Sequence, residues 1–167
     1  LGDDYDVVYI NHMVSRDLNG DAKVDTMYLE LIDINHGTLK ANYPYLIRAK
    51  NEVARNLKIE LENNVTLYST KSESQKTVEC SSALTKFEFV GTYNTVTRDG
   101  LADKYGSDKV SYGVRTSTGN FAPMSSTAKI APFRLYMVRT EKDGSPVILD
   151  NLMQSIGMRL IGEENED

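Results

Sequence analysis

Apolar and polar residues alternate along most of this chain. Residues 57–62 read LKIELE, so every second side chain is apolar. The same period of two recurs in four further segments, at residues 45–49, 86–89, 110–115 and 133–138. Because successive side chains of a strand point to opposite faces of its sheet, this pattern predicts strands with one buried face. In the last segment it places Phe133, Leu135 and Met137 on one face.

Residues 5–14 and 26–35 are rich in Val, Ile, Tyr and Leu, as strands prefer, and both are long enough to cross a domain. Shorter strands are predicted at 65–69, 77–82 and 157–161. Turn-forming pairs separate the candidates: Asn19-Gly20, Asn63-Asn64, Asp99-Gly100, Gly119-Asn120 and Asp143-Gly144. Strands of five to ten residues between polar turns predict an all-β fold, a mostly antiparallel β-sandwich or alternatively an open barrel.

Helical periodicity is scarce, and the sequence predicts at most one short helix, near residues 150–156. Asp150 would cap it, Leu152 and Ile156 would share a face, and Gly157 would end it. Residues 70–76 and 96–109 are predicted to be loops. The chain has 167 residues, which is enough for one domain with a real core. We therefore expect a single β-sandwich domain over residues 1–162, followed by an acidic tail at 163–167.

Composition narrows the function classes. The net charge is −5, and no basic stripe is present, so the sequence argues against nucleic-acid binding. No apolar run approaches the roughly 20 residues that a membrane helix needs, so membrane insertion by this segment is not expected. No signal peptide is visible in the residues given.

The segment at residues 17–28 is the strongest candidate for binding chemistry. Oxygen-bearing side chains alternate at Asp17, Asn19 and Asp21, the Lys23 carbonyl follows, and Asp25 stands at a position where calcium loops often bind through water; these five residues are our candidate calcium ligands.

Two positions of that loop depart from the calcium pattern. Ala22 stands where the sharp-turn glycine should be, and Tyr28 stands where the closing acid should be. The competing interpretation is a polar hairpin connection in which Asn19-Gly20 supplies the positive-φ turn. Calcium is thus an optional occupant, and the sequence predicts no other cofactor.

The sequence offers little material for catalysis. There is no GxSxG, HExxH, P-loop or GxGxxG pattern, and only two histidines, His12 and His36, are present. We interpret His12 as a structural strand residue and His36 as a turn residue. Cys80, the single cysteine, is expected to be a buried and inert thiol on a strand. The prediction is a protein without enzymatic activity and without catalytic residues.

A sugar-binding surface is the third candidate. Such surfaces stack sugar rings on exposed aromatic side chains. Tryptophan is absent, but there are ten tyrosines, most of them in strand patterns. The loop-placed exceptions are Tyr43, Tyr45 and Tyr105, and these are our candidate ligand-binding residues.

Four segments, taken in order, resemble one known family. NYPYLIRAK (42–50) resembles the N-x-PYLIKAK segment of C-terminal domains in surface proteins of Bacteroidetes, many of which carry leucine-rich repeats upstream. LNGDAKVDTMYLELIDINHGTLKAN (18–42), CSSALTKFEFVGTYNTV (80–96) and GNFAPMSSTAKIAPFRLYM (119–137) resemble further segments of the same domains. The likeness extends over most of residues 4–162, although Ala22 replaces the second glycine of the family's NGDG.

The resemblance implies a secreted or cell-surface β-rich domain with no established active site. It implies a role in adhesion, scaffolding or display, within a longer protein whose other domains are its partners. Its recurring Gly91-Thr92-Tyr93 and Phe133-Arg134 elements are interpreted as fold markers, with Arg134 pairing across the sheet. The alternative is a module that binds a carbohydrate or a protein through a loop surface, with a host or surface protein or a glycan as partner.

Overall fold

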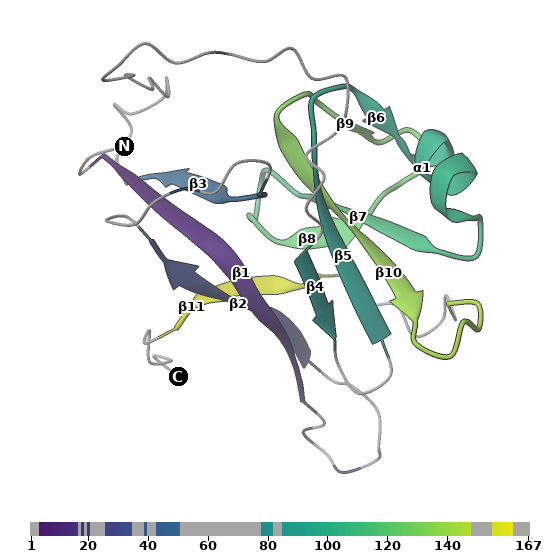
Figure 1. The fold of residues 1–167 in the computed structure, drawn as a ribbon, viewed down its shortest axis with the longest axis horizontal. Coiled ribbons are helices and arrows are strands. Elements are labelled where there is room, and N and C mark those ends of the chain that lie inside the picture. The colour runs from purple at the N-terminus through teal and green to yellow at the C-terminus, as the bar shows by residue number, and fades with distance from the viewer. Residues whose placement is uncertain are drawn as a thin grey trace.

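Two packed β-sheets form the body of the molecule (Figure 1). The computed structural model describes residues 4–16, 18, 20, 26–34, 39, 43–50, 78–81, 85–147 and 155–161. The predicted strands at 57–62 and 65–69, the predicted loop at 70–76, the five candidate calcium ligands and His36 lie outside these residues.

The first sheet contains β1 (Tyr5–Arg16), β2 (Thr26–Asp33), β3 (Leu46–Ala49) and β11 (Gly157–Leu160). Their order is β11-β2-β1-β3. β1 pairs with β2 and β3 in antiparallel fashion, whereas β11 runs parallel to β2. The predicted strands at 5–14, 26–35, 45–49 and 157–161 are confirmed.

The second sheet contains β4 (Val78–Ser81), β5 (Thr85–Thr92), β7 (Val110–Val114), β8 (Phe121–Pro123) and β10 (Arg134–Glu141). Its order is β4-β5-β10-β7-β8, and every neighbouring pair is antiparallel. A small ribbon of β6 (Val96–Thr97) and β9 (Lys129–Ile130) stands beside it. The predicted all-β, mostly antiparallel sandwich is thus confirmed.

Side chains from both sheets share one apolar core. Residues from β1 and β2 meet residues from β5, β7, β8 and β10, and the fully buried aromatics Phe87, Phe89, Tyr112 and Phe121 fill much of the space. The Phe89 and Phe121 rings meet edge to face, with centroids 5.8 Å apart. This core is what the period-two pattern predicts, because the inner faces of both sheets must be removed from water.

A second core lies on the other face of the five-stranded sheet. It contains Val90, Leu101, Met124, Ile130, Tyr136 and Val138, and the β6–β9 ribbon and the helix α1 (Arg98–Tyr105) supply its outer side (Figure 1). β10 is therefore buried on both faces: Leu135 and Met137 enter the sandwich core, and Tyr136 and Val138 enter the second core. The expectation of one buried face for residues 133–138 is wrong for this strand.

The helix α1 is the main departure from the predicted elements. The sequence predicts a loop at 96–109, but Thr97 caps a helix there by accepting a hydrogen bond from Gly100 N at 3.1 Å. Gly106 ends the helix with a φ of 104°, a conformation that favours glycine. Of the helix predicted for 150–156, residues 150–154 lie outside the described residues, Ile156 bridges to Phe121, and Gly157 begins β11.

Asn11 forms a β-bulge in β1. Ile10 pairs with Leu31 and His12 with Glu30, so Asn11 has no opposite residue in β2. The extra residue shifts the side-chain alternation by one position. Val8 and Ile10 therefore face the core before the bulge, and Met13 faces it after the bulge. Within the described residues, no helix is long and apolar enough to cross a membrane.

Candidate recognition surface

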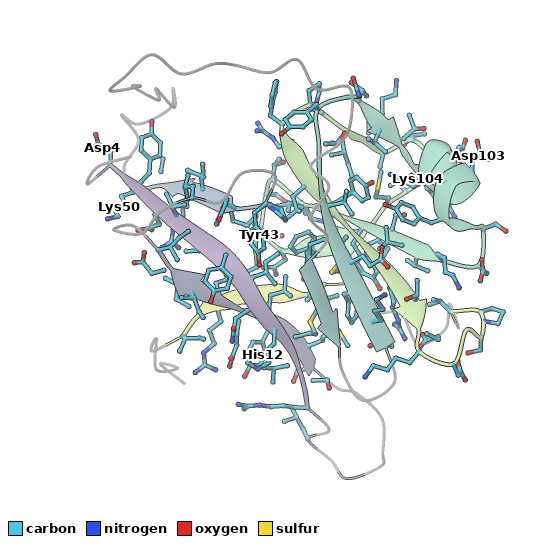
Figure 2. All side chains as sticks on the ribbon, in the orientation of Figure 1. Asp4, His12, Tyr43, Lys50, Asp103 and Lys104 are labelled. Atoms are coloured by element: carbon cyan, nitrogen blue, oxygen red, sulfur yellow. The ribbon has the colours of Figure 1, made fainter. Side chains whose placement is uncertain are left out.

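The three tyrosines proposed from the sequence do not form one surface. Tyr43 packs against the sandwich core and is partly buried there, as Figure 2 shows near the centre of the molecule. Its ring centroid lies 5.2 Å from that of Tyr45 and 6.4 Å from that of Tyr9. Tyr43 and Tyr45 are thus neighbours, but Tyr43 serves largely as a packing residue.

Tyr105 lies on the opposite side of the five-stranded sheet. It packs against the second core, and its hydroxyl forms a hydrogen bond of 3.2 Å with the Tyr136 hydroxyl. The Lys104 ammonium lies 5.0 Å from the centre of the Tyr105 ring. Because the two cores face opposite sides of one sheet, Tyr105 cannot act on the same ligand ring as Tyr43.

The other residues singled out from the sequence occupy ordinary strand positions. His12 is exposed; its Nε2 lies 3.2 Å from a carboxylate oxygen of Glu30, and its Nδ1 lies 2.8 Å from the Asn11 amide nitrogen (Figure 2). Cys80 lies on β4 opposite Phe87. Among the described residues, no group of three His, Cys, Asp or Glu side chains is placed to hold a metal ion.

Two exposed aromatic side chains meet at one end of the five-stranded sheet, where β5 ends and β10 begins. The rings of Tyr93 and Phe133 stand edge to face, with centroids 5.8 Å apart and planes at 76°. Phe133 is 76% exposed, the highest value among the large apolar side chains of the described residues. Edge-to-face contact holds both rings in place, while much of the Phe133 ring remains open to solvent.

The backbone at Phe133 is strained. Its φ is +58°, and it is the one described residue other than glycine with a positive φ. Such a conformation costs a bulky residue about 1–3 kcal/mol. Phe133 N donates a hydrogen bond of 2.7 Å to Thr92 O, and the Thr92 hydroxyl in turn bonds the backbone of Asn94. Buried Thr92 therefore holds the backbone of Phe133 through its carbonyl and the turn that follows Tyr93 through its hydroxyl.

Four cationic residues belong to segments that reach this end of the sheet. Arg134 follows Phe133 directly, Thr97 of β6 lies opposite Lys129 of β9, and Arg98 comes next along the chain. β7 runs antiparallel to β10, with Gly113 opposite Tyr136, so its end leads to Arg115 at the same end of the sheet. Figure 1 shows β6 and β9 beside the end of β5 and the start of β10.

These four cations are all exposed, and none makes an ion pair within the described part of the chain. Asp99 lies in the first turn of α1 beside Arg98, and Asp103 follows later in the same helix. This end of the sheet is therefore cationic on a chain whose net charge is −5. We call the surface formed by Tyr93, Phe133, Arg98, Arg115, Lys129 and Arg134 the aromatic end.

Sequence reasoning missed the aromatic end for a clear reason. Period-two alternation assigned Phe133 to the same buried face as Leu135 and Met137, but its left-handed backbone turns it out of the strand. The expectation that Phe133 shares the buried face of Leu135 and Met137 is therefore wrong. Arg134 is exposed, and its guanidinium bonds the carbonyl of Phe133 at 3.3 Å instead of pairing across the sheet.

A largely buried ion pair, Arg139 with Glu141, lies at the other end of β10 and close to Tyr112. Arg139 Nη2 donates to Glu141 Oε1 at 2.8 Å. Within the described residues, the hydroxyl of Tyr112 and Nε of Arg139 are buried and form no hydrogen bond of standard geometry, although the Arg139 guanidinium lies close enough to the hydroxyl to lower its pKa. Burial raises the pKa of Tyr112, and the nearby charge of Arg139 offsets part of that rise.

Known proteins give no further guide to this site. No family model matches the sequence, and neither curated proteins nor solved structures yield a match. The chemistry of the aromatic end, an open aromatic ring and cations that form no ion pair with the described residues, suits non-covalent recognition of a ligand.

Proposed function

We propose that this chain is a non-enzymatic β-sandwich domain of an exported bacterial surface protein, and that it serves adhesion, scaffolding or display. The resemblance of residues 4–162 to surface domains of Bacteroidetes supports the extracellular location. The aromatic end supports the adhesive role. Calcium is not required for this function, and neither nucleic acid nor membrane insertion enters it.

The observation that carries the proposal is the exposed and strained Phe133. An apolar ring that is 76% exposed gains little from burial in its own domain, and its positive φ costs stability. Both costs are offset if the ring contacts a partner. Backbone strain in a surface loop beside a rigid sheet is a recurrent property of recognition sites.

The test is an adhesion assay with the purified domain displayed on beads. Wild-type beads are applied to surfaces coated with collagen, fibronectin, laminin or mucin, and retained beads are counted under flow. We expect retention on at least one surface and its loss for Phe133→Ala. Ile47→Ala, which removes an exposed apolar side chain of the other sheet, is the matched control and should adhere like wild type.

Two outcomes decide against the proposal. Equal retention of Phe133→Ala and wild type would remove the aromatic end from the adhesive role. Absence of retention on every surface, with beads that bind antibody against the folded domain, would contradict adhesion itself.

The alternative function, a module that binds a carbohydrate or protein ligand, is proposed only for the aromatic end. Tyr43 and Tyr105 face different cores, so a single sugar platform built from both is not favoured. The aromatic end is the loop surface on which a carbohydrate or protein ligand would find an open ring and charged groups together.

A further inference from the structure

We propose that the aromatic end binds an anionic polysaccharide, a chain of sugar rings that carry carboxylate or sulfate groups. This inference rests on the proposed adhesive function and names the class of its ligand. Three observations on the surface support it: an open aromatic face, a set of cations that form no ion pair with the described residues, and the scarcity of other apolar groups.

The aromatic pair supplies the apolar contact. A pyranose ring presents C–H groups on one face, and these pack on the face of an aromatic ring with removal of apolar surface from water. Phe133 is open enough to accept such a ring, whereas Tyr93, 38% exposed, supports it from the side at 76°. Two rings at that angle do not form a flat platform, so one sugar residue is contacted by stacking and its neighbours by other groups.

The cations supply the contacts to those neighbours. Arg98, Arg115, Lys129 and Arg134 come from four different segments that end at this side of the sheet, and Asp99 lies beside Arg98. Guanidinium groups form paired hydrogen bonds with carboxylates and sulfates. Because the whole chain is acidic, an anionic ligand is guided to this end and repelled elsewhere.

The same features disfavour the core of a protein–protein interface. Such cores are depleted of charged residues, and lysine is uncommon there. Here the exposed large apolar side chains are Tyr93 and Phe133, with Val114 at the end of β7, and the four cations belong to segments that reach the same end of the sheet. A surface with more charged than apolar exposed side chains suits a polyanion that lies across it better than it suits the apolar anchor of a protein partner.

The experiment is affinity electrophoresis of the whole chain in native gels. Separate gels contain hyaluronan, which carries carboxylates alone, chondroitin sulfate, which carries carboxylates and sulfates, or neutral dextran. We expect retardation by one or both anionic polymers and none by dextran, with weaker retardation as sodium chloride is raised. Retardation by hyaluronan assigns carboxylate recognition, and retardation by chondroitin sulfate alone assigns sulfate recognition.

The variants identify the surface. Phe133→Ala should weaken binding about tenfold, the factor for roughly 50 Å² of apolar surface left in water. Arg134→Ala should weaken it about threefold, as expected for an exposed ion pair. Lys142→Ala removes an exposed cation beyond the opposite end of β10 and should bind like wild type. Thermal unfolding of each variant establishes that the fold is retained.

Three results would overturn the inference. Retardation by neither anionic polymer excludes the ligand class, and equal retardation of Phe133→Ala and wild type excludes the surface. Adhesion that depends on Phe133 but survives enzymatic removal of glycans from the coated protein assigns a protein ligand. In that last case the proposed adhesive function stands while the polysaccharide inference fails.

Discussion

The Arg139 guanidinium donates to the Glu141 carboxylate at 2.8 Å, and both side chains are largely withdrawn from water, with exposed fractions of 11% and 13%. The two residues are separated by one position, so they stand on the same face of β10. Arg139 lies opposite Phe87 on one neighbouring strand and Val110 on the other. A charge pair therefore stands between apolar neighbours at the end of the sandwich.

Replacing Glu141 by Gln is expected to destabilise the fold by about 2 kcal/mol. The substitution leaves the Arg139 charge largely buried without a compensating carboxylate, and breaking a buried pair on one side typically costs more than the pair contributes. Denaturant unfolding measures the effect. Glu88→Gln is the control, because its pair with Lys86 is more exposed and should change stability by less than about 1 kcal/mol. Equal effects of both substitutions would contradict the special burial of Arg139.

Replacing Tyr112 by Phe is expected to leave stability unchanged or to raise it by up to about 1 kcal/mol. Among the described residues the buried Tyr112 hydroxyl has only a poorly aligned contact with Arg139, so its removal relieves most of a desolvation cost while the ring keeps its packing. Thermal unfolding at neutral pH measures the change. A clear loss of stability would mean that the hydroxyl has a bound partner, such as an ordered water.

The same residue predicts a loss of stability in alkali. Burial raises the pKa of Tyr112 above its usual value of 10.0, so the folded state retains a proton that the unfolded state releases. The contribution of Tyr112 to the free energy of unfolding is fully present below about pH 10, and it declines as the pH rises through the higher pKa of the folded state. Between pH 9 and 11.5, the free energy of unfolding should therefore decrease less steeply for Tyr112→Phe than for wild type. Parallel profiles would argue against a raised pKa.

Glycine at position 133 is expected to give a more stable protein than alanine, by about 1 kcal/mol. Glycine is ordinarily the less favourable of the two because it loses more backbone freedom on folding, but it accepts a φ of +58° without strain. Chemical denaturation of Phe133→Gly and Phe133→Ala gives the difference directly. Alanine as the more stable variant would show that the backbone at Phe133 relaxes to negative φ.

Leu101→Ala is expected to cost about 2–4 kcal/mol, as for other large-to-small changes in a core. Leu101 is the one buried residue of α1, and it is 1% exposed in the second core. Calorimetry of the variant measures the loss. The control is Ile161→Ala, which truncates an exposed side chain and should be nearly neutral. A small effect of Leu101→Ala would mean that α1 packs only loosely on the sheet.

The sequence predicted most strands of the sandwich, either from alternating apolar and polar residues or from runs rich in Val, Ile, Tyr and Leu, but it did not predict β8. β10 does not follow this alternation. Its second face carries Tyr136 and Val138, which pack beneath α1 and the β6–β9 ribbon. A helix was not predicted at Arg98–Tyr105 because Leu101 is its one buried position, so no amphipathic stripe is visible. Its cap at Thr97 and its packing on the sheet stabilise it instead.

The candidate site was less predictable than the fold. Tyr93 and Phe133 are 40 positions apart, and their contact depends on the pairing of Thr92 with Arg134 across two strands. A left-handed backbone at Phe133 leaves no periodic signal, because alternation assumes that every residue of a strand is extended. Of the tyrosines chosen from loop positions, Tyr43 packs against the core and is only partly buried there.

The segment at residues 17–28 yields a prediction about calcium. Ala22 replaces the turn glycine and Tyr28 replaces the closing acid, so the remaining ligands are too few for tight binding. We expect the melting temperature to be the same with 2 mM calcium chloride, roughly the concentration at which weak extracellular sites fill, and with a chelator. A rise of several degrees with calcium that disappears in Asp17→Asn and Asp21→Asn would show instead that Asp17, Asn19, Asp21, Lys23 and Asp25 form a filled site, because a ligand bound only to the folded state must stabilise it.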